Sequence, residues 1–383
     1  MFKSKLRTIS IKSSLVKVLF ILLGSTTHSM GQLNNSFFED KPISQIDTLK
    51  KLTLKVNVLS FLKNNEYFNP LVDGYTLFGQ LIAPNITYQA SSTVQISAGG
   101  FFRKDFGNNG FYQINPTFTI NYKKNGIHLL FGNLEGNLNH QLIEPLFNFE
   151  RVVTEQLEHG IQLKTNKKRL ITDTWIDWQS MIYKGSDFQE EIWGGSSLSF
   201  RLSEKRNNQI IGQFTAKHKG GQINIGTAPI QTTLNMTVGV QLALFKNNQT
   251  FLRELNCSQF FTAFTSDNPK WPNQNNGFGI LSSVNAKTKW VDLTLNYWKS
   301  DKYISPIGGD LYQSVSTNFL QPNTSEVNRE ILIFRIMKEL KLDNTLSFLL
   351  RIEPYFNLKS SEMEHSESIF LKYTFAKKLK TSF

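Results

Sequence analysis

Residues 112–122 alternate between apolar and polar side chains without exception. The even positions carry tyrosine, isoleucine, proline and phenylalanine, and the odd positions carry only glutamine, asparagine and threonine. Because successive side chains of a β-strand point to opposite faces, this segment predicts a strand with one apolar and one polar face. Tyr112 and Tyr122 stand at the two ends of the apolar face, where a membrane-spanning strand places its interfacial aromatic residues.

The same alternation recurs along most of the chain. It is long in 231–245 and 345–358, and shorter in 52–58, 198–202 and 291–297. A soluble β-sandwich also alternates, so one such strand would not distinguish the two classes. Repetition over nearly the whole chain favours a transmembrane barrel, whose strands all present an apolar face to lipid.

Sixteen strands are expected, with fourteen and eighteen as the alternatives. Their ranges are 52–62, 74–88, 92–103, 111–122, 126–133, 156–165, 170–183, 194–203, 209–218, 230–246, 249–264, 277–286, 289–298, 328–338, 345–358 and 366–376. Short polar turns such as 123–125 and 247–248 follow even-numbered strands, and long connections such as 134–155 and 299–327 follow odd-numbered ones. Bacterial outer-membrane barrels alternate short periplasmic turns with long external loops in this way. The fold class is therefore all-β: a transmembrane antiparallel β-barrel with both termini in the periplasm.

The first residues predict export. Residues 1–17 hold five basic and no acidic side chains, 18–23 are apolar, and small or polar residues continue to Gly31. This order is typical of a secretory signal peptide. We expect a signal peptide at 1–31, a short periplasmic segment at 32–51 and an outer-membrane barrel at 52–383.

Composition limits the kinds of molecule that the protein is expected to bind. The net charge of +12 falls to +7 without the five basic signal residues, which would suit anionic solutes or the phosphates of lipopolysaccharide. The lysines are scattered through turns, so no nucleic-acid binding is expected. Cys257 is the only cysteine, which excludes an intrachain disulfide and a cysteine metal cluster, and no cofactor is expected.

The last expected strand alternates Ile369, Leu371, Tyr373 and Phe375, and the sequence ends on Phe383. An amphipathic terminal strand with a late aromatic residue resembles the signal read by the barrel-assembly machinery. With the export signal and the alternating strands, it makes the chain resemble Gram-negative outer-membrane porins. No family motif transfers a substrate or a functional residue.

A porin-like channel for small polar or anionic solutes is the function this resemblance favours, because about sixteen strands enclose an aqueous lumen. Loop 134–155 is the main candidate for a constriction or binding surface. Its candidate residues are Glu135, Asn137, His140, Glu144, Glu150 and Arg151. Loop 299–327 is a candidate lid or plug on length alone, and 265–276 is a weaker third candidate.

Two alternatives stay open: a non-conducting barrel that acts in binding, adhesion or assembly, and a lipid-modifying enzyme. The enzyme would need a nucleophile and a base near His159, which shares the apolar parity of Leu157, Ile161 and Leu163. Because no catalytic motif is found, we expect no enzymatic activity. The carboxylates in 185–191 do not match a calcium loop, so no metal site is expected. The oligomeric state is open.

Overall fold

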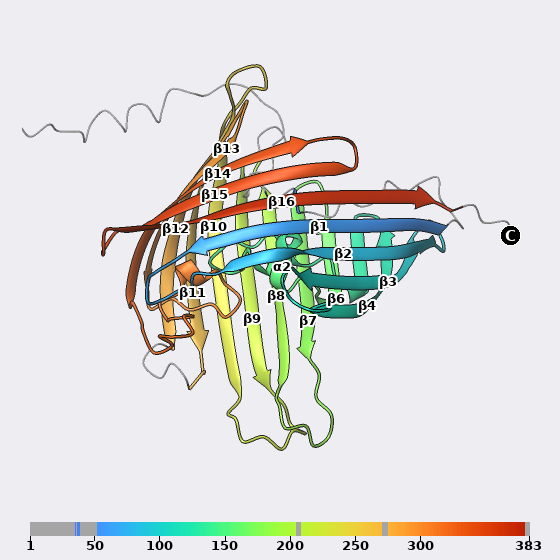
Figure 1. Ribbon diagram of the computed structural model, residues 1–383, viewed down its shortest axis with the longest axis horizontal. Coiled ribbons are helices and arrows are strands. Elements are labelled where there is room, and N and C mark those ends of the chain that lie inside the picture. The colour runs from blue at the N-terminus through green and yellow to red at the C-terminus, as the bar shows by residue number, and fades with distance from the viewer. Residues whose placement is uncertain (1–34, 36, 39–51, 204–207, 270–274, 380–383) are drawn as a thin grey trace, which may run out of the picture.

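The computed structural model describes residues 35, 37–38, 52–203, 208–269 and 275–379. Sixteen antiparallel strands form one closed barrel, in which each strand pairs with its neighbours in sequence and β1 pairs with β16 (Figure 1). The barrel architecture and the strand number predicted from the sequence are confirmed. The expected signal peptide and nearly all of the expected periplasmic segment lie outside the described residues.

Six strands are longer than the ranges expected from the sequence, seven are shorter and three have the same length. The strands are β1 (Leu52–Glu66), β2 (Thr76–Gln89), β3 (Val94–Asp105), β4 (Gln113–Lys124), β5 (Ile127–Asn133), β6 (His159–Asn166), β7 (Leu170–Ser180), β8 (Glu190–Arg201), β9 (Gln209–Gly220), β10 (Gln231–Lys246), β11 (Leu252–Ser266), β12 (Asn276–Thr288), β13 (Asp292–Asp301), β14 (Asn328–Lys341), β15 (Leu346–Asn357) and β16 (Glu362–Lys378).

The alternation of the sequence decides which side chains face outward. In β10, Met236 and Val238 are more than half exposed, whereas Asn235 and Thr237 between them are buried. A closed barrel turns one face of every strand to its surroundings and the other to its lumen. The apolar face therefore forms the outer wall, as a lipid environment requires, and the polar face lines the interior.

The two prolines within strands, Pro116 and Pro354, do not introduce bulges. Pro116 pairs with Gly100 of β3, and β5 pairs with β4 only from Thr119 onward, so one side of the proline is free of the ladder. Near Pro354 the β14–β15 pairing is interrupted and resumes in the same register. A local gap in the ladder is thus enough to accommodate a residue without an N–H group.

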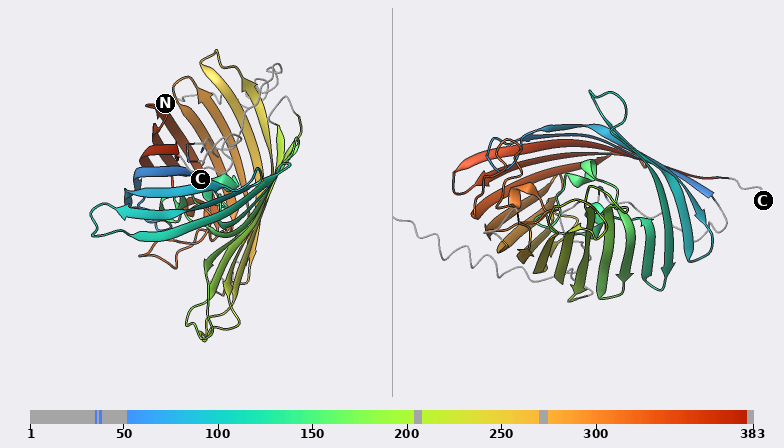
Figure 2. Two further views of the ribbon diagram at one scale, coloured as in Figure 1. Left: turned by 90° about the vertical axis from the view of Figure 1, so that its right-hand side faces the viewer. Right: turned by 90° about the horizontal axis from the view of Figure 1, so that it is seen from below.

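Two long connections enter the lumen. Residues 134–158 join β5 to β6 and contain a 3-10 turn, η1 (Asn137–His140), and one helical turn, α2 (Arg151–Thr154). Residues 302–327 join β13 to β14 and contain η2 (Asp310–Tyr312). Figure 2 shows both segments within the ring of strands. In the described part of the chain, no helix is long and apolar enough to cross a membrane.

Candidate functional site

Loop 134–158 reaches across the lumen and contacts walls on several sides. The Glu150 carboxylate accepts a hydrogen bond from Lys63 Nζ of β1 at 2.7 Å. The backbone N–H of Ile143 donates to Gln213 Oε1 of β9 at 3.0 Å. Because these contacts come from well-separated strands, the loop is fixed inside the barrel and does not project above it.

His140 is the most completely enclosed of the six predicted site residues. Its Nδ1 lies 2.9 Å from Asp173 Oδ2 of β7, and its Nε2 lies 2.8 Å from Glu158 Oε2. Its ring stacks on Trp175 with centroids 3.6 Å apart. Burial by itself lowers the pKa of His140, but the two carboxylates outweigh it and raise the pKa to about 9. His140 is therefore a buried cation that anchors the loop.

Glu144 anchors the middle of the same loop. Arg335 Nη2 of β14 lies 2.7 Å from Glu144 Oε1 and 2.6 Å from Glu353 Oε2. Arg351 of β15 also contacts both carboxylates. On the other side, the Tyr312 hydroxyl donates to Glu144 Oε2 at 2.6 Å, so Glu144 joins two strands and the second loop.

The remaining predicted residues are also engaged. Glu135 forms an ion pair with Lys164 of β6 at 2.9 Å. Asn137 donates its backbone N–H to Glu158 Oε1 at 2.7 Å. The Arg151 guanidinium lies 2.6 Å from a carboxylate oxygen of Glu155. These contacts lie within the barrel or the loop, and the role of the six residues in solute binding stays a prediction.

The second loop is interlocked with the first. The Asn148 N–H donates to the Ile307 carbonyl at 2.7 Å, and the Gly309 N–H donates to the Glu144 carbonyl at 2.8 Å. Burial and the charge of Glu150 raise the pKa of Asp310 to about 7. Its carboxyl accepts a hydrogen bond from Asn148 Nδ2 at 3.0 Å, and the plug predicted from the length of 299–327 is thus seated in the lumen.

Small cavities remain around the interlocked loops. One of about 70 Å³ is lined by Glu144, Glu150, Asp310 and the neighbouring wall, and one of about 170 Å³ is lined by Glu135 and Asn137. His140 and Arg151 line neither of these two. Both are below the roughly 300 Å³ at which ligand pockets usually begin, so neither of these two cavities offers the usual room for a substrate.

The outer wall carries the second group of candidates. His159 begins β6 on the same face as Ile161 and Leu163, which are both 44% exposed. Its position on the outer face therefore agrees with the expectation from the sequence. Among the described residues, no hydroxyl lies within hydrogen-bond distance of its imidazole. The described residues therefore provide no nucleophile at this position.

A histidine and a hydroxyl do meet on the outer wall, three strands further along on β9 and β10. His218 near the end of β9 pairs in register with Thr232 near the start of β10. The His218 Nδ1 atom lies 3.0 Å from Thr232 Oγ1. Both residues are at even-numbered positions, as are the outward-facing Phe214 of β9 and Met236 of β10, so both side chains are on the outer face.

Backbone contacts fix Thr232 beside the histidine. Its N–H donates to the Asp267 carboxylate, and its carbonyl accepts a hydrogen bond from the Asp267 N–H at 3.1 Å. The pair lies at the ends of β9 and β10 that join through 221–230, which the alternation of connections places outside the cell. An imidazole in contact with a hydroxyl can accept its proton and so activate it as a nucleophile.

Sequence reasoning missed this pair, although a signal was present. Thr232 shares the even parity of Leu234 and Met236, and His218 shares that of Ile210 and Phe214. Two outward polar residues at the joined ends of adjacent strands must face each other if the register is symmetric about the loop. The sequence alone did not specify the register between β9 and β10 that pairs these two residues.

In the described ranges, no group of three or more His, Cys, Asp or Glu side chains is arranged to hold a metal ion. The connection formed by residues 181–189 joins β7 to β8 and holds Asp187, whereas Glu190 and Glu191 of the acidic segment noted in the sequence belong to β8. This connection bonds to the β9–β10 connection through Gly185 N–H and the Ile223 carbonyl, 2.9 Å apart. Residues 270–274 of the third candidate loop lie outside the described chain.

Comparison with known structures supports the fold. OccK11 (OpdR) of Pseudomonas aeruginosa is 9% identical, with a TM-score of 0.52 over 87% of this chain and 99% of that chain. OmpTdeltaL8, a loop deletion mutant of the Vibrio cholerae outer membrane protein OmpT, is 9% identical, with a TM-score of 0.51 over 85% and 99%. At such identities the likeness shows a shared outer-membrane barrel fold and nothing finer. Among curated proteins, no sequence matches significantly.

A family of barrel enzymes is the informative match. The family model described as lipid A 3′-O-deacylase-type matches residues 44–382. This match overturns the expectation that the chain has no enzymatic activity. The expectation failed because it rested on the absence of motifs with fixed spacing, whereas in a barrel the reacting groups can come from different strands.

Proposed function

The chain belongs to the lipid A 3′-O-deacylase-type family, and from this premise we propose that it hydrolyses an ester-linked acyl chain of lipid A in the outer membrane. The single observation that supports this activity within the chain is the 3.0 Å contact between His218 Nδ1 and Thr232 Oγ1. Of the alternatives open from the sequence, the lipid-modifying enzyme has the best support.

The location of the pair suits a membrane substrate. Below Thr232, β10 presents Leu234, Met236, Val238, Val240, Leu242 and Leu244 on its outer face. At about 3.4 Å per residue this stripe is about 34 Å long, and a strand tilt of about 40° reduces its height to the roughly 25 Å of a barrel's apolar band. Thr232 and His218 therefore lie at the external boundary of the band, where lipid A esters would lie.

The proposed reaction is acyl transfer through the threonine. Thr232 Oγ1 attacks the ester carbonyl carbon while His218 Nδ1 accepts its proton, which gives a tetrahedral intermediate. The intermediate collapses as the bond to the sugar oxygen breaks and the imidazolium returns the proton to that oxygen. Water, deprotonated by the same imidazole, then attacks the acyl-threonine. The bond from the acyl carbon to Thr232 Oγ1 breaks, the imidazolium returns the proton to Oγ1, and the fatty acid is released.

A channel function has less support. Sixteen strands would enclose an open lumen, but loops 134–158 and 302–327 occupy it and bond to each other. Lipid and lipopolysaccharide are the surroundings of an outer-membrane barrel. Small polar solutes and the barrel-assembly machinery stay predicted partners.

Mass spectrometry of lipid A from vesicles that contain the refolded protein tests the proposal. We expect the wild type to release one acyl chain, and Thr232→Ala and His218→Gln each to lower the rate at least about a hundredfold, the usual contribution of a general base. Thr232→Ser keeps the hydroxyl and should keep measurable activity. His159→Gln is the matched control, because it removes an outward histidine without a hydroxyl partner.

Full deacylation by Thr232→Ala would contradict the assignment of the nucleophile. No deacylation by the wild type, under conditions in which the barrel is folded, would contradict the proposed activity itself.

A further inference from the structure

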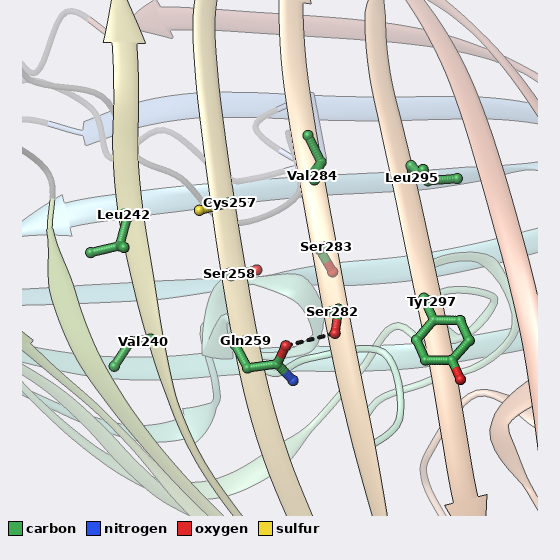
Figure 3. Close-up of a pocket in the computed structure, with 10 residues that line it drawn as sticks. All are labelled: Val240, Leu242, Cys257, Ser258, Gln259, Ser282, Ser283, Val284, Leu295 and Tyr297. Atoms are coloured by element: carbon green, nitrogen blue, oxygen red, sulfur yellow. Dashed lines mark hydrogen bonds between the residues drawn. The ribbon is translucent and has the colours of Figure 1, made fainter. Parts of the chain in front are cut away.

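The outer wall carries a second polar group away from the His218–Thr232 pair. Gln259 of β11 pairs in register with Ser282 of β12, and Ser282 pairs with Tyr297 of β13. All three side chains lie on the outer side of the strands, as Figure 3 shows with the loops of the lumen behind them. Val240 of β10 and Leu332 of β14 continue this row at either end.

The wall is hollowed along this row. A groove of about 400 Å³ is lined by Gln259, Ser282 and Tyr297 and by apolar neighbours (Figure 3). Its apolar lining comprises Val240, Leu242, Cys257, Val284 and Leu295. The hollow forms because short side chains at 257 and 282 stand below Phe261, which is 55% exposed, and beside Tyr297. Its size is within the range of small-ligand pockets.

The polar atoms in the groove have unused hydrogen-bonding capacity. Ser282 Oγ donates to Gln259 Oε1 at 2.6 Å, and no described residue donates to Ser282 Oγ in return. Within the part of the chain that the structure describes, Gln259 Nε2 makes only long contacts, at 3.4 and 3.3 Å, to the carbonyls of Phe260 and Leu281. A polar group that faces hydrocarbon without good partners is costly, so an amide and a hydroxyl on this face indicate a ligand with oxygen atoms.

The groove lies in the apolar band, and its Tyr297 end is closer to the external boundary than its Val240 end. Above the row, the Tyr297 hydroxyl donates to Glu330 Oε1 at 2.6 Å, and Lys299 Nζ lies 3.4 Å from Glu330 Oε2. Glu330 is close to the external end of β14, whereas Val240 is the tenth residue of β10 and lies near the middle of its apolar stripe. The two ends of the groove therefore differ in depth because the strands are tilted.

We propose that this groove seats one acyl chain of a lipid A molecule. The hydrocarbon covers the apolar lining, an ester or hydroxyl oxygen of the chain bonds Gln259 Nε2 and Ser282 Oγ, and Lys299 faces the anionic headgroup. The identity of the lipid rests on the proposed function, whereas the groove and its polarity do not. The site would hold the substrate, or a second lipid A molecule, apart from the reacting groups.

The chain provides its own reporter, because Cys257 is the only cysteine and lines the groove. The experiment measures the rate at which N-phenylmaleimide alkylates Cys257 in detergent micelles, with added purified lipid A or with phosphatidylethanolamine. At a lipid A concentration ten times its dissociation constant, occupancy should slow alkylation about tenfold. Phosphatidylethanolamine should slow it far less.

Two variants in β12 separate groove binding from general effects of lipid. Ser282→Phe fills the groove and should abolish protection by lipid A, whereas Ala286→Phe places the same ring on the same face outside the lining. A heat-modifiability gel confirms that each barrel is folded. Equal protection by the two lipids, no protection by either, or protection retained in Ser282→Phe would each overturn the proposal.

Thr232→Ala distinguishes the two proposals. If the variant has lost deacylation but lipid A still protects its Cys257, the groove stands independently of the chemistry. If the wild type shows no deacylation and lipid A still protects, only the proposed function fails. If lipid A does not protect Cys257 but deacylation is intact, only the proposal that the groove binds lipid A is overturned.

Discussion

At the scale of single residues, His140 shows how a polar interior is fixed. A buried imidazolium lies between Asp173 and Glu158 and offsets part of the charge of the two carboxylates, both of which it contacts. Charged groups in low dielectric are stable only when paired, so removal of one partner costs more than the pair itself contributes. The histidine thus holds η1 against the wall of β7.

The charge of His140 predicts a pH-dependent stability. Because its pKa of about 9 is above the unfolded value of about 6.5, its contribution is complete below pH 6.5 and is lost as the pH rises through 9. The shift corresponds to at most about 3 kcal/mol. His140→Gln should lower the midpoint of denaturant unfolding at pH 6, with a difference from the wild type that narrows towards pH 10. His159→Gln is the control, and a constant difference for His140→Gln would contradict the ionised state.

How far residues could be read from the sequence depends on where their partners lie. The outward parity of His159, Thr232 and His218 needs only local alternation and is visible in the sequence. The partners of Glu144 and Glu150 lie 191 and 87 residues away, on Arg335 and Lys63. Such pairings depend on the register of remote strands and on the path of the loop, which no local pattern specifies.

At the scale of elements, the strands were predictable because a barrel repeats one rule sixteen times. Connection lengths were informative as well, although 202–208 is a longer periplasmic connection and 358–361 a shorter external one than the alternation predicts. For 134–155, the residue types suggest a loop that folds inward as a constriction, whereas for 299–327 only the length suggests a plug. Their mutual hydrogen bonds depend on three-dimensional proximity and have no sequence signature.

The interlocked loops predict a low conductance. Replacing 304–313 by a short Gly-Ser linker removes the Ile307, Gly309 and Tyr312 contacts to the first loop and should open the lumen. In planar bilayers we expect the intact barrel to give little current and the shortened variant to give steps typical of an open pore. Shortening 106–112, which joins β3 to β4, is the control. Large conductance of the intact protein would contradict a filled lumen and revive the channel interpretation.

At the scale of the whole molecule, the interior of the barrel is packed, whereas a large barrel usually has a water-filled interior that carries its function. Strand number alone predicts a water-filled lumen, yet Trp175, Trp193 and Trp298 are buried on the inner faces of their strands and pack near loop residues such as Phe147 and Tyr312. The interior behaves like the core of a globular protein, whereas the outer wall carries a base–hydroxyl pair and a groove. Function is therefore expected on the surface that faces lipid.

The lipid-facing wall itself makes a prediction that depends on depth. Val238 lies in the middle of the apolar stripe of β10 and is 57% exposed, whereas Leu202, 47% exposed, follows the periplasmic end of β8. Arginine at the centre of a barrel's lipid face costs about 2–4 kcal/mol, and near the interface about 0–1 kcal/mol. Val238→Arg should therefore destabilise folding into vesicles far more than Leu202→Arg, as measured by guanidinium titration of tryptophan fluorescence. Equal losses of folding free energy at the two positions would mean that the exposed apolar stripe does not lie in hydrocarbon. That result would also contradict the placement of His218 and Thr232 at the external boundary of the stripe.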